Sequence, residues 1–304
     1  MTSIPNTTIP LLGLSGTGKT TFLVALDVVL DDQTDKNGLV HSGLAADRVY
    51  LQPLREKWLR GEELEHTSRQ IPPPPHQLLV QHQASNTVTG FDVPDLAGET
   101  FDSQFETRSF SREFGAKLKH ATGLLLFLHC DGNAAHEILN EPALIDSATS
   151  DNTASERAED IEEWVLSNAS QQTKLVDLLQ FIAELRPLGA PMPVSVIISA
   201  WDRVEKLPDS SAAEMPKKPL PFLQKKWPLL FQFLSNNSGK FGIRVFGVSA
   251  RGGGSDPVEV KRLTRIKRPS ERVLVVDDSH RSNDITRPVQ WVLGLLPITG
   301  STDA

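Results

Sequence analysis

Residues Gly13 to Thr21 read "GLSGTGKTT" and satisfy the pattern G-x-x-x-x-G-K-[ST] at every required position. In this pattern the glycines let backbone N–H groups surround phosphate oxygens, the lysine reaches the outer phosphates, and the hydroxyl that follows it ligates Mg²⁺. The sequence therefore predicts a phosphate-binding loop whose residues are Gly13, Ser15, Gly16, Thr17, Gly18, Lys19, Thr20 and Thr21, with Thr20 as a metal ligand.

The sequence on either side of this stretch favours the same interpretation. "TTIPLLGL" is a short apolar run with β-branched residues, typical of a strand, and it ends at the loop. "TTFLVALDVVL" then places Phe22, Leu23, Leu26 and Val29 at helical spacing. A strand, a glycine loop and a helix in this order place the helix N-terminus where it can bind a phosphate anion. The alternative, a glycine turn that binds no ligand, would not need this arrangement.

Further strands and helices alternate along the chain. Buried strands are expected in "ATGLLLFLHCD" (121–131), "PVSVIISAWD" (193–202) and, as the last core strand, "FGIRVFGVSA" (241–250); "HQLLVQHQ" and "SNTVTGFDVPD" predict a hairpin. This order predicts an α/β fold with a doubly wound, mostly parallel sheet and helices on both faces. We expect one enlarged domain over residues 1–304, with its ligand at the carboxyl ends of the strands.

Four helical stretches are predicted after the first helix. Residues 43–64 indicate an amphipathic helix interrupted at Pro53, with Leu44, Val49 and Trp58 buried. Residues 159–189 indicate a long helix with a break near Ser167, and residues 219–237 one helix bent at Pro228. The stretch "DITRPVQWVLGLL" (284–296) predicts a closing helix that packs Val289, Val292 and Leu293 on the sheet.

Composition limits the class of protein. The 304 residues carry a formal net charge of −7, which argues against nucleic-acid binding as the main task. Cys130 is the only cysteine, so no disulfide can form within the chain, and no apolar run is long enough to span a membrane. We therefore expect a soluble cytoplasmic protein.

Three further motifs follow the loop, each after a predicted strand. "FDVPDLAGETF" contains Asp95-x-x-Gly98; "VIISAWDRV" places Asp202 after Ser199, Ala200 and Trp201; "VFGVSAR" places Ser249, Ala250 and Arg251 last. In this order the motifs resemble D-x-x-G, N-K-x-D and S-A-K of Ras-like, translation-factor-class GTPases.

The resemblance implies a role for each matching residue. Asp95 holds Mg²⁺ through water beside Thr20, and the Gly98 N–H senses the γ-phosphate. Asp202 accepts hydrogen bonds from the ring N–H and the amino group of guanine, while a backbone N–H near Ala250, after Ser249, contacts the guanine oxygen. The ligand implied is GTP or GDP, with Mg²⁺ as cofactor.

The departures from the family pattern bear on rate and selectivity. Glu99 stands where the family carries a water-orienting glutamine; its carboxylate can position water, and it also repels the γ-phosphate. Ser15 crowds an incoming arginine finger, so we expect slow hydrolysis. Ser199 and Ala200 replace the Asn-Lys pair, and Trp201 either covers the base or is a core residue.

The layout is also larger than that of compact members. Insertions are expected at about residues 31–75, the switch I region, and at 131–158. Thr67 is the candidate switch I threonine that closes over Mg²⁺; the alternative is an ordinary surface threonine. The enlarged layout is similar to that of bacterial paired GTPases of conflict-system operons, which implies a protein effector or a second GTPase-like partner.

Other residues have a simpler interpretation. The basic segment from Lys261 to Arg272 is either a solvated, partner-facing surface or a contact for nucleic acid or an acidic protein. Arg108 and Arg112 could supply an arginine to the site or form surface ion pairs. The histidines show no metal-ligand spacing, and Cys130 is interpreted as a small buried side chain.

Taken together, the sequence predicts a GTP-binding switch with slow Mg²⁺-dependent hydrolysis, in which Lys19, Glu99 and Thr67 are the catalytic candidates. Two alternatives stay open: a binding-only pseudo-GTPase scaffold, and an ATP-dependent protein with the same phosphate loop.

Overall fold

The computed structural model describes residues 6–32, 38–42, 51–64, 76–83, 86–93, 104–132, 169–186, 189–208 and 215–296. The strands are β1 (Asn6–Thr8), β2 (Leu11–Leu12), β3 (Leu39–His41), β4 (His76–His82), β5 (Thr87–Val93), β6 (Leu124–His129), β7 (Met192–Ser199), β8 (Phe241–Ser249), β9 (Leu274–Val276) and β10 (Arg281–Ser282). The helices are α1 (Lys19–Asp32), α2 (Leu51–Leu59), α4 (Arg112–His120), α6 (Gln171–Leu185), α7 (Trp201–Glu205), α8 (Pro219–Lys226), α9 (Pro228–Asn236), α10 (Pro257–Thr264), the 3₁₀ helix η4 (Pro269–Arg272) and α11 (Arg287–Val292).

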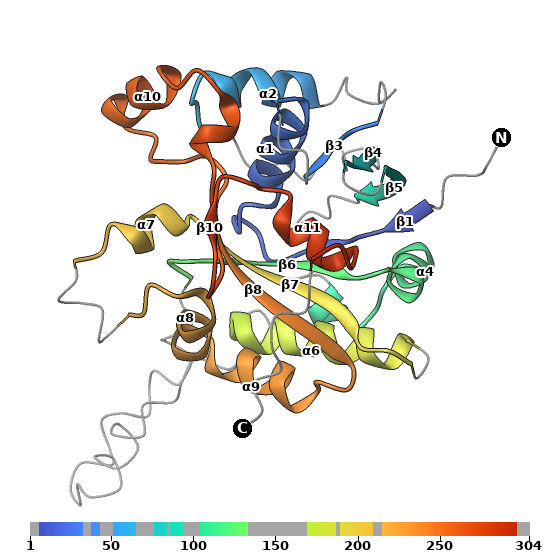
Figure 1. Cartoon of the computed structure of the whole chain (residues 1–304). Coiled ribbons are helices and arrows are strands. Elements are labelled where there is room, and N and C mark those ends of the chain that lie inside the picture. Colours follow the sequence, from blue (N-terminus) through green and yellow to red (C-terminus); the bar gives the residue numbers. More distant parts are fainter. Residues whose placement is uncertain are drawn as a thin grey trace, which may run out of the picture.

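The central strands form the parallel sheet that the sequence predicts. One sheet has the order β10-β9-β8-β7-β6-β2, and its strands β2, β6, β7 and β8 are parallel (Figure 1). A second sheet has the order β1-β5-β4-β3, with β4 and β5 paired antiparallel as the expected hairpin. The chain passes from β1 to β2 over Ile9 and Pro10, and the Pro10 carbonyl accepts a hydrogen bond from the Leu125 N–H at 3.0 Å.

The central strands carry continuous apolar runs because helices pack on both faces of the sheet. In β6, Leu124, Leu126 and Leu128 belong to a core with α4, α6, α8 and α9, whereas Leu125 and Phe127 belong to a core with α1 and α11. Figure 1 shows α6, α8 and α9 on one side of the central strands and α1, α2 and α11 on the other. The same alternation runs through β7, so both faces of the central strands are dry.

Several helices differ from the expectation. Residues 219–237 form two helices, α8 and α9, because Trp227 leaves the helical conformation before Pro228 begins α9. Pro53 lies within α2 (Leu51–Leu59), so the expected interruption at this residue is absent from the described part of the helix. The predictions on Leu44, Val49 and Ser167 lie outside the described residues.

The expectation that β8 is the last core strand was wrong. Strand β9 pairs antiparallel with β8, and Val275 of β9 is buried. Asp277 follows β9 and joins three elements, since it accepts hydrogen bonds from Arg244 of β8 at 2.8 Å and from Arg287 of α11 at 3.1 Å. Helix α11 then packs on β7 and β6, as predicted, with Val289 buried.

Candidate functional site

The phosphate loop lies between β2 and α1, and its glycines are required by geometry. Gly13 has φ +147°, and a Cβ on it would lie 2.6 Å from the backbone oxygen of Phe127. Gly18 has φ +87°, with the Cβ of Ser199 3.2 Å from the place where a side chain would begin. Both conformations disfavour side chains. The short distances to Phe127 and Ser199 show that the loop lies against the ends of β6 and β7.

Lys19 is the first residue of α1 and is buried inside the curve of the loop. Its ammonium group donates hydrogen bonds to the carbonyl oxygens of Gly13 at 2.7 Å and Leu14 at 2.9 Å. The Thr17 hydroxyl donates to the Leu14 carbonyl at 2.8 Å and braces the same turn. A buried ammonium beside the N-terminus of a 14-residue helix creates a site suited to a polyanion.

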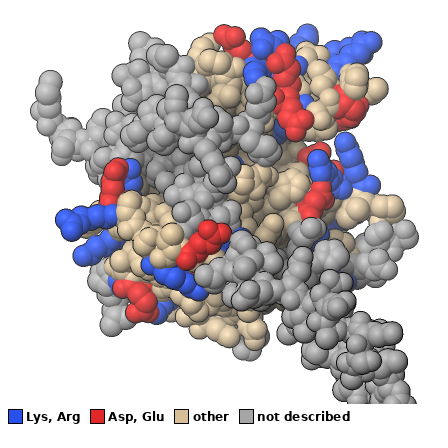
Figure 2. All heavy atoms as spheres, turned by 180° about the vertical axis from the view of Figure 1, so that it is seen from behind, with Lys and Arg blue, Asp and Glu red and all other residues tan. Residues whose placement is uncertain are grey.

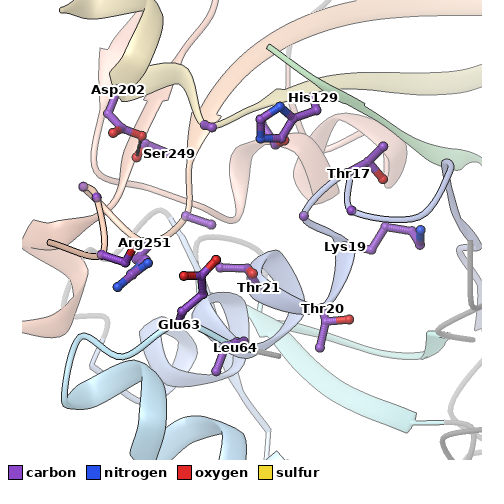
Figure 3. A pocket seen from close by; sticks show the side chains of 18 of the residues that line it. Thr17, Lys19, Thr20, Thr21, Glu63, Leu64, His129, Asp202, Ser249 and Arg251 are labelled. Carbon is purple, nitrogen blue, oxygen red and sulfur yellow. Dashed lines mark hydrogen bonds between the residues drawn. The ribbon is translucent and has the colours of Figure 1, made fainter. Parts of the chain in front are cut away.

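A cavity of about 260 Å³ joins this loop to the last two motifs. Figure 3 shows the phosphate loop on one side of it and Asp202, Ser249 and Arg251 on the other. The predicted residues that line it are Ser15, Gly16, Thr17, Gly18, Lys19, Thr20, Thr21, Asp202, Ser249 and Ala250. Gly13 instead packs beneath the loop, and Thr67, Asp95, Gly98 and Glu99 lie outside the described residues.

Asp202 is held at the far end of the cavity by Ser249. The Ser249 hydroxyl donates to Asp202 Oδ1 at 2.6 Å and accepts from the Gly252 N–H at 3.2 Å. Ser249 is buried at the end of β8, and Asp202 lies in the first turn of α7 after β7. An oriented carboxylate of this kind can accept two hydrogen bonds from adjacent donors, which guanine presents and adenine does not.

Trp201 is a core residue, so the interpretation that it covers a base was wrong. Its side chain is fully buried, its ring meets Phe222 edge-on at 5.3 Å between centroids, and its Nε1–H donates to Glu205 at 3.2 Å. The preceding Ala200 has φ +55°, the left-handed conformation, and this turn directs Trp201 inward while Asp202 reaches the cavity.

Helix α2 contributes cavity residues that the sequence motifs do not indicate. Trp58 was predicted to be buried, and it is, but it also lines the cavity and donates its Nε1–H to the Ala250 carbonyl at 3.1 Å. Arg251 donates to the Gly61 carbonyl at 2.6 Å, just after α2. Glu62, Glu63 and Leu64 line the cavity beyond that turn.

A buried ion pair fixes α2 to α1. Asp27 of α1 is fully buried and pairs with Arg55 of α2, which also contacts Asp31 at 2.7 Å. Burial acts to lower the pKa of the Arg55 guanidinium, but the hydrogen bonds and charges of Asp27 and Asp31 outweigh it and raise that pKa. His41 of β3 lies 3.2 Å from Asp27 Oδ1, so three elements meet at this carboxylate.

Comparison with known proteins identifies the family to which this fold and cavity belong. A family model described as Double-GTPase 1 matches residues 10–292. The chain belongs to the Double-GTPase 1 family. The predicted resemblance to paired GTPases is thereby confirmed, and the matched range includes the phosphate loop, both ends of the cavity and α11.

Solved structures give weaker likenesses, and no curated protein matches the chain. A bacterial selenocysteine-specific elongation factor is 14% identical with a TM-score of 0.33; the match covers 84% of this chain and 28% of that one. The signal recognition particle receptor SRb-GTP/SRX complex from Chaetomium thermophilum is 14% identical with a TM-score of 0.38, covering 87% of this chain and 97% of that one. A small COPII coat GTPase from Encephalitozoon cuniculi in complex with GDP is 12% identical with a TM-score of 0.34, covering 85% of this chain and 77% of that one.

The end of β6 places three potential metal ligands together in this Double-GTPase 1 chain. Ligand atoms of His129, Cys130 and Asp131 lie within 4.8 Å of one another. Burial, with a further contribution from the charge of Asp131, raises the pKa of the Cys130 thiol to about 12, which disfavours the thiolate that a metal needs. Cys130 is buried, as predicted from the sequence, and His129 lines the cavity.

The basic segment is divided between structure and surface. Arg272 is buried against the Trp58 ring and donates to the Leu59 carbonyl at 2.9 Å, so it supports α2. The expectation of a solvated segment was therefore wrong at this residue. Lys261, Arg265, Lys267 and Arg268 are exposed. Figure 2 shows Lys and Arg side chains gathered, among acidic ones, at the edge where α2 and α10 lie.

Arg108 forms a surface ion pair with Asp177 and lies over the Phe105 ring, which agrees with the simpler interpretation of that residue. Among the described helices, none combines the length and apolar character needed to cross a membrane.

Proposed function

We propose that this chain is a molecular switch that binds GTP and GDP and hydrolyses GTP slowly with Mg²⁺. The observation that carries the proposal is one cavity with the phosphate loop at one end and the Asp202–Ser249 pair at the other. Membership of the Double-GTPase 1 family supports it. The molecule acts, in this proposal, as one enlarged domain.

The residues have separate tasks along the nucleotide. Lys19 and the loop N–H groups stabilise the negative charge of the phosphates, and Asp202 selects guanine. Glu99 orients a water that attacks the γ-phosphorus; a new P–O bond forms, the bond to the GDP oxygen breaks, and the water proton leaves with the phosphate. Gly98 senses whether the γ-phosphate is present.

The residues at the phosphate end fit a magnesium ion. Thr20 lines the cavity next to Lys19 and offers a hard oxygen ligand, the type that Mg²⁺ prefers. Asp95, through water, and Thr67 are the proposed companions of Thr20. When bound, the ion neutralises charge on the outer phosphates, which lowers the barrier to transfer.

Nucleotide binding tests the proposal first. Fluorescent GDP, a GTP analogue and an ATP analogue are titrated into the protein with and without Mg²⁺, and into an Asp202→Ala variant. We expect guanine binding that depends on Mg²⁺ and is lost in the variant. Equal or better binding of the ATP analogue would contradict the guanine assignment and favour an ATP-dependent protein.

Hydrolysis is tested separately by phosphate release in a single turnover, with Lys19→Ala as the control. Release above this control supports a slow enzyme. Tight guanine binding with no release above the control would leave the binding-only scaffold as the function.

A further inference from the structure

His129 lies at a position in the cavity that no predicted motif covers. It is the last residue of β6, in register with Ser199 at the end of β7, and its side chain is half-buried. In Figure 3 its ring projects into the cavity between Thr17 of the phosphate loop and Asp202 at the base end. The ring therefore faces the middle of the cavity, where the ribose and the first phosphate of a bound nucleotide lie if the proposed function holds.

The turn after β6 determines which ring nitrogen carries the proton. The backbone N–H of Asp131 donates to His129 Nδ1 at 3.2 Å. A backbone amide can only donate, so Nδ1 must present a lone pair, and the proton of the neutral ring is on Nε2. Burial lowers the pKa of His129; the charge of Asp131 acts to raise this pKa, and the charge of Arg203 lowers it further. The net shift is downward, so the neutral ring dominates at neutral pH.

Further contacts hold the same turn in place beside the ends of β6 and β7. The Cys130 N–H donates to the Ser199 carbonyl at 3.3 Å, and the Gly132 N–H to the His129 carbonyl at 2.9 Å. Asp131 is paired with Arg203 of α7. Within the described part of the chain no residue accepts a hydrogen bond from His129 Nε2.

We propose that His129 is a nucleotide-binding residue whose Nε2–H donates a hydrogen bond to an oxygen of the ribose–phosphate part of the guanine nucleotide. This part of a nucleotide is rich in acceptor oxygens and is the same whatever the base. The contribution of His129 is therefore independent of the base, whereas that of Asp202 selects guanine. The proposal rests on the proposed function of the cavity.

Substitutions separate the donor from the ring. His129→Phe keeps a flat ring without a donor, and we expect it to weaken GDP and inosine diphosphate equally, by roughly five- to tenfold, the value of one neutral hydrogen bond. His129→Gln, which restores an N–H donor on a side chain of similar reach, recovers most of that loss. His120→Phe, on the exposed end of α4, is the matched control and leaves both affinities unchanged.

The outcomes distinguish this proposal from the one it rests on. Wild-type protein that binds no GDP overturns both. Wild-type protein that binds GDP while His129→Phe binds it equally well overturns only the role of His129, as does a loss confined to GDP and absent for inosine diphosphate.

A measurement on the wild-type protein does not depend on any variant folding. Nuclear magnetic resonance of the imidazole nitrogens reports the tautomer directly. We expect a neutral ring protonated at Nε2, whose N–H resonance shifts when GDP is added. A ring protonated at Nδ1, or an Nε2–H signal that GDP leaves in place, contradicts the proposal.

Discussion

Replacing Ser249 with alanine tests whether guanine recognition depends on a prearranged carboxylate. The hydroxyl is buried, donates to Asp202 Oδ1 at 2.6 Å and accepts from the Gly252 N–H at 3.2 Å. A hydrogen bond to a charged group contributes about 1.5–3 kcal/mol, and about 1.4 kcal/mol corresponds to a tenfold change in affinity. If the bond serves to orient Asp202, Ser249→Ala weakens GDP binding by about ten- to a hundredfold.

The chain provides a matched control in Ser195→Ala. Ser195 is a buried serine in β7 whose hydroxyl donates to the Pro288 carbonyl at 2.7 Å, outside the cavity. Both variants lose one buried hydrogen bond, so both should unfold at lower urea concentration. Fluorescent GDP titration then separates them, because only Ser249→Ala should lose affinity. A Ser249→Ala protein that binds GDP within about twofold of the Ser195→Ala control would refute the argument that this hydroxyl positions Asp202.

Three further predictions test the loop, the acid stability and the single thiol. Gly13→Ala places a Cβ against the backbone and should lower the free energy of unfolding by about 3 kcal/mol. Gly115→Ala in α4, where a Cβ would have no atom within 4 Å, should raise that free energy by about 0.5–1 kcal/mol. Urea titrations in which the two variants behave alike contradict this prediction. Burial acts to raise the pKa of Asp277, but the Ser279 backbone N–H and the two arginine partners of Asp277 hold this pKa below its ordinary value. The stabilisation by Asp277 is therefore complete above the ordinary value of about 4 and is lost as pH falls toward the folded pKa. The free energy of unfolding should fall less steeply with falling pH in Asp277→Asn, and an unchanged pH profile counts against this ion pair. Cys130, buried with a thiol pKa of about 12, should react with a thiol reagent at pH 8 only after denaturation, and rapid labelling of the native protein contradicts its burial.

Much of the fold could be predicted because its signals are local. The glycine and lysine spacing of residues 13–21 lies within one strand, loop and helix, and the structure places Lys19 and Thr20 at the start of α1, where both line the cavity. The apolar runs of β6, β7 and β8 indicated strands covered on both faces, since only such strands need no polar side. Strand β9 was not predicted because its three apolar residues, followed by acidic ones, are too few to show the alternation of apolar and polar side chains that indicates a strand.

The sequence by itself determined the phosphate loop, the central strands β6, β7 and β8 with their order along the chain, and the place of Asp202 and Ser249 at two strand ends. Only the tertiary structure decided that Trp201 belongs to the core and that Trp58, 192 residues before its partner Ala250, lines the cavity. It also decided that His129 faces the cavity. The physical reason is range: a phosphate loop is specified by neighbouring residues, whereas these contacts depend on how distant segments pack together, which no local pattern records.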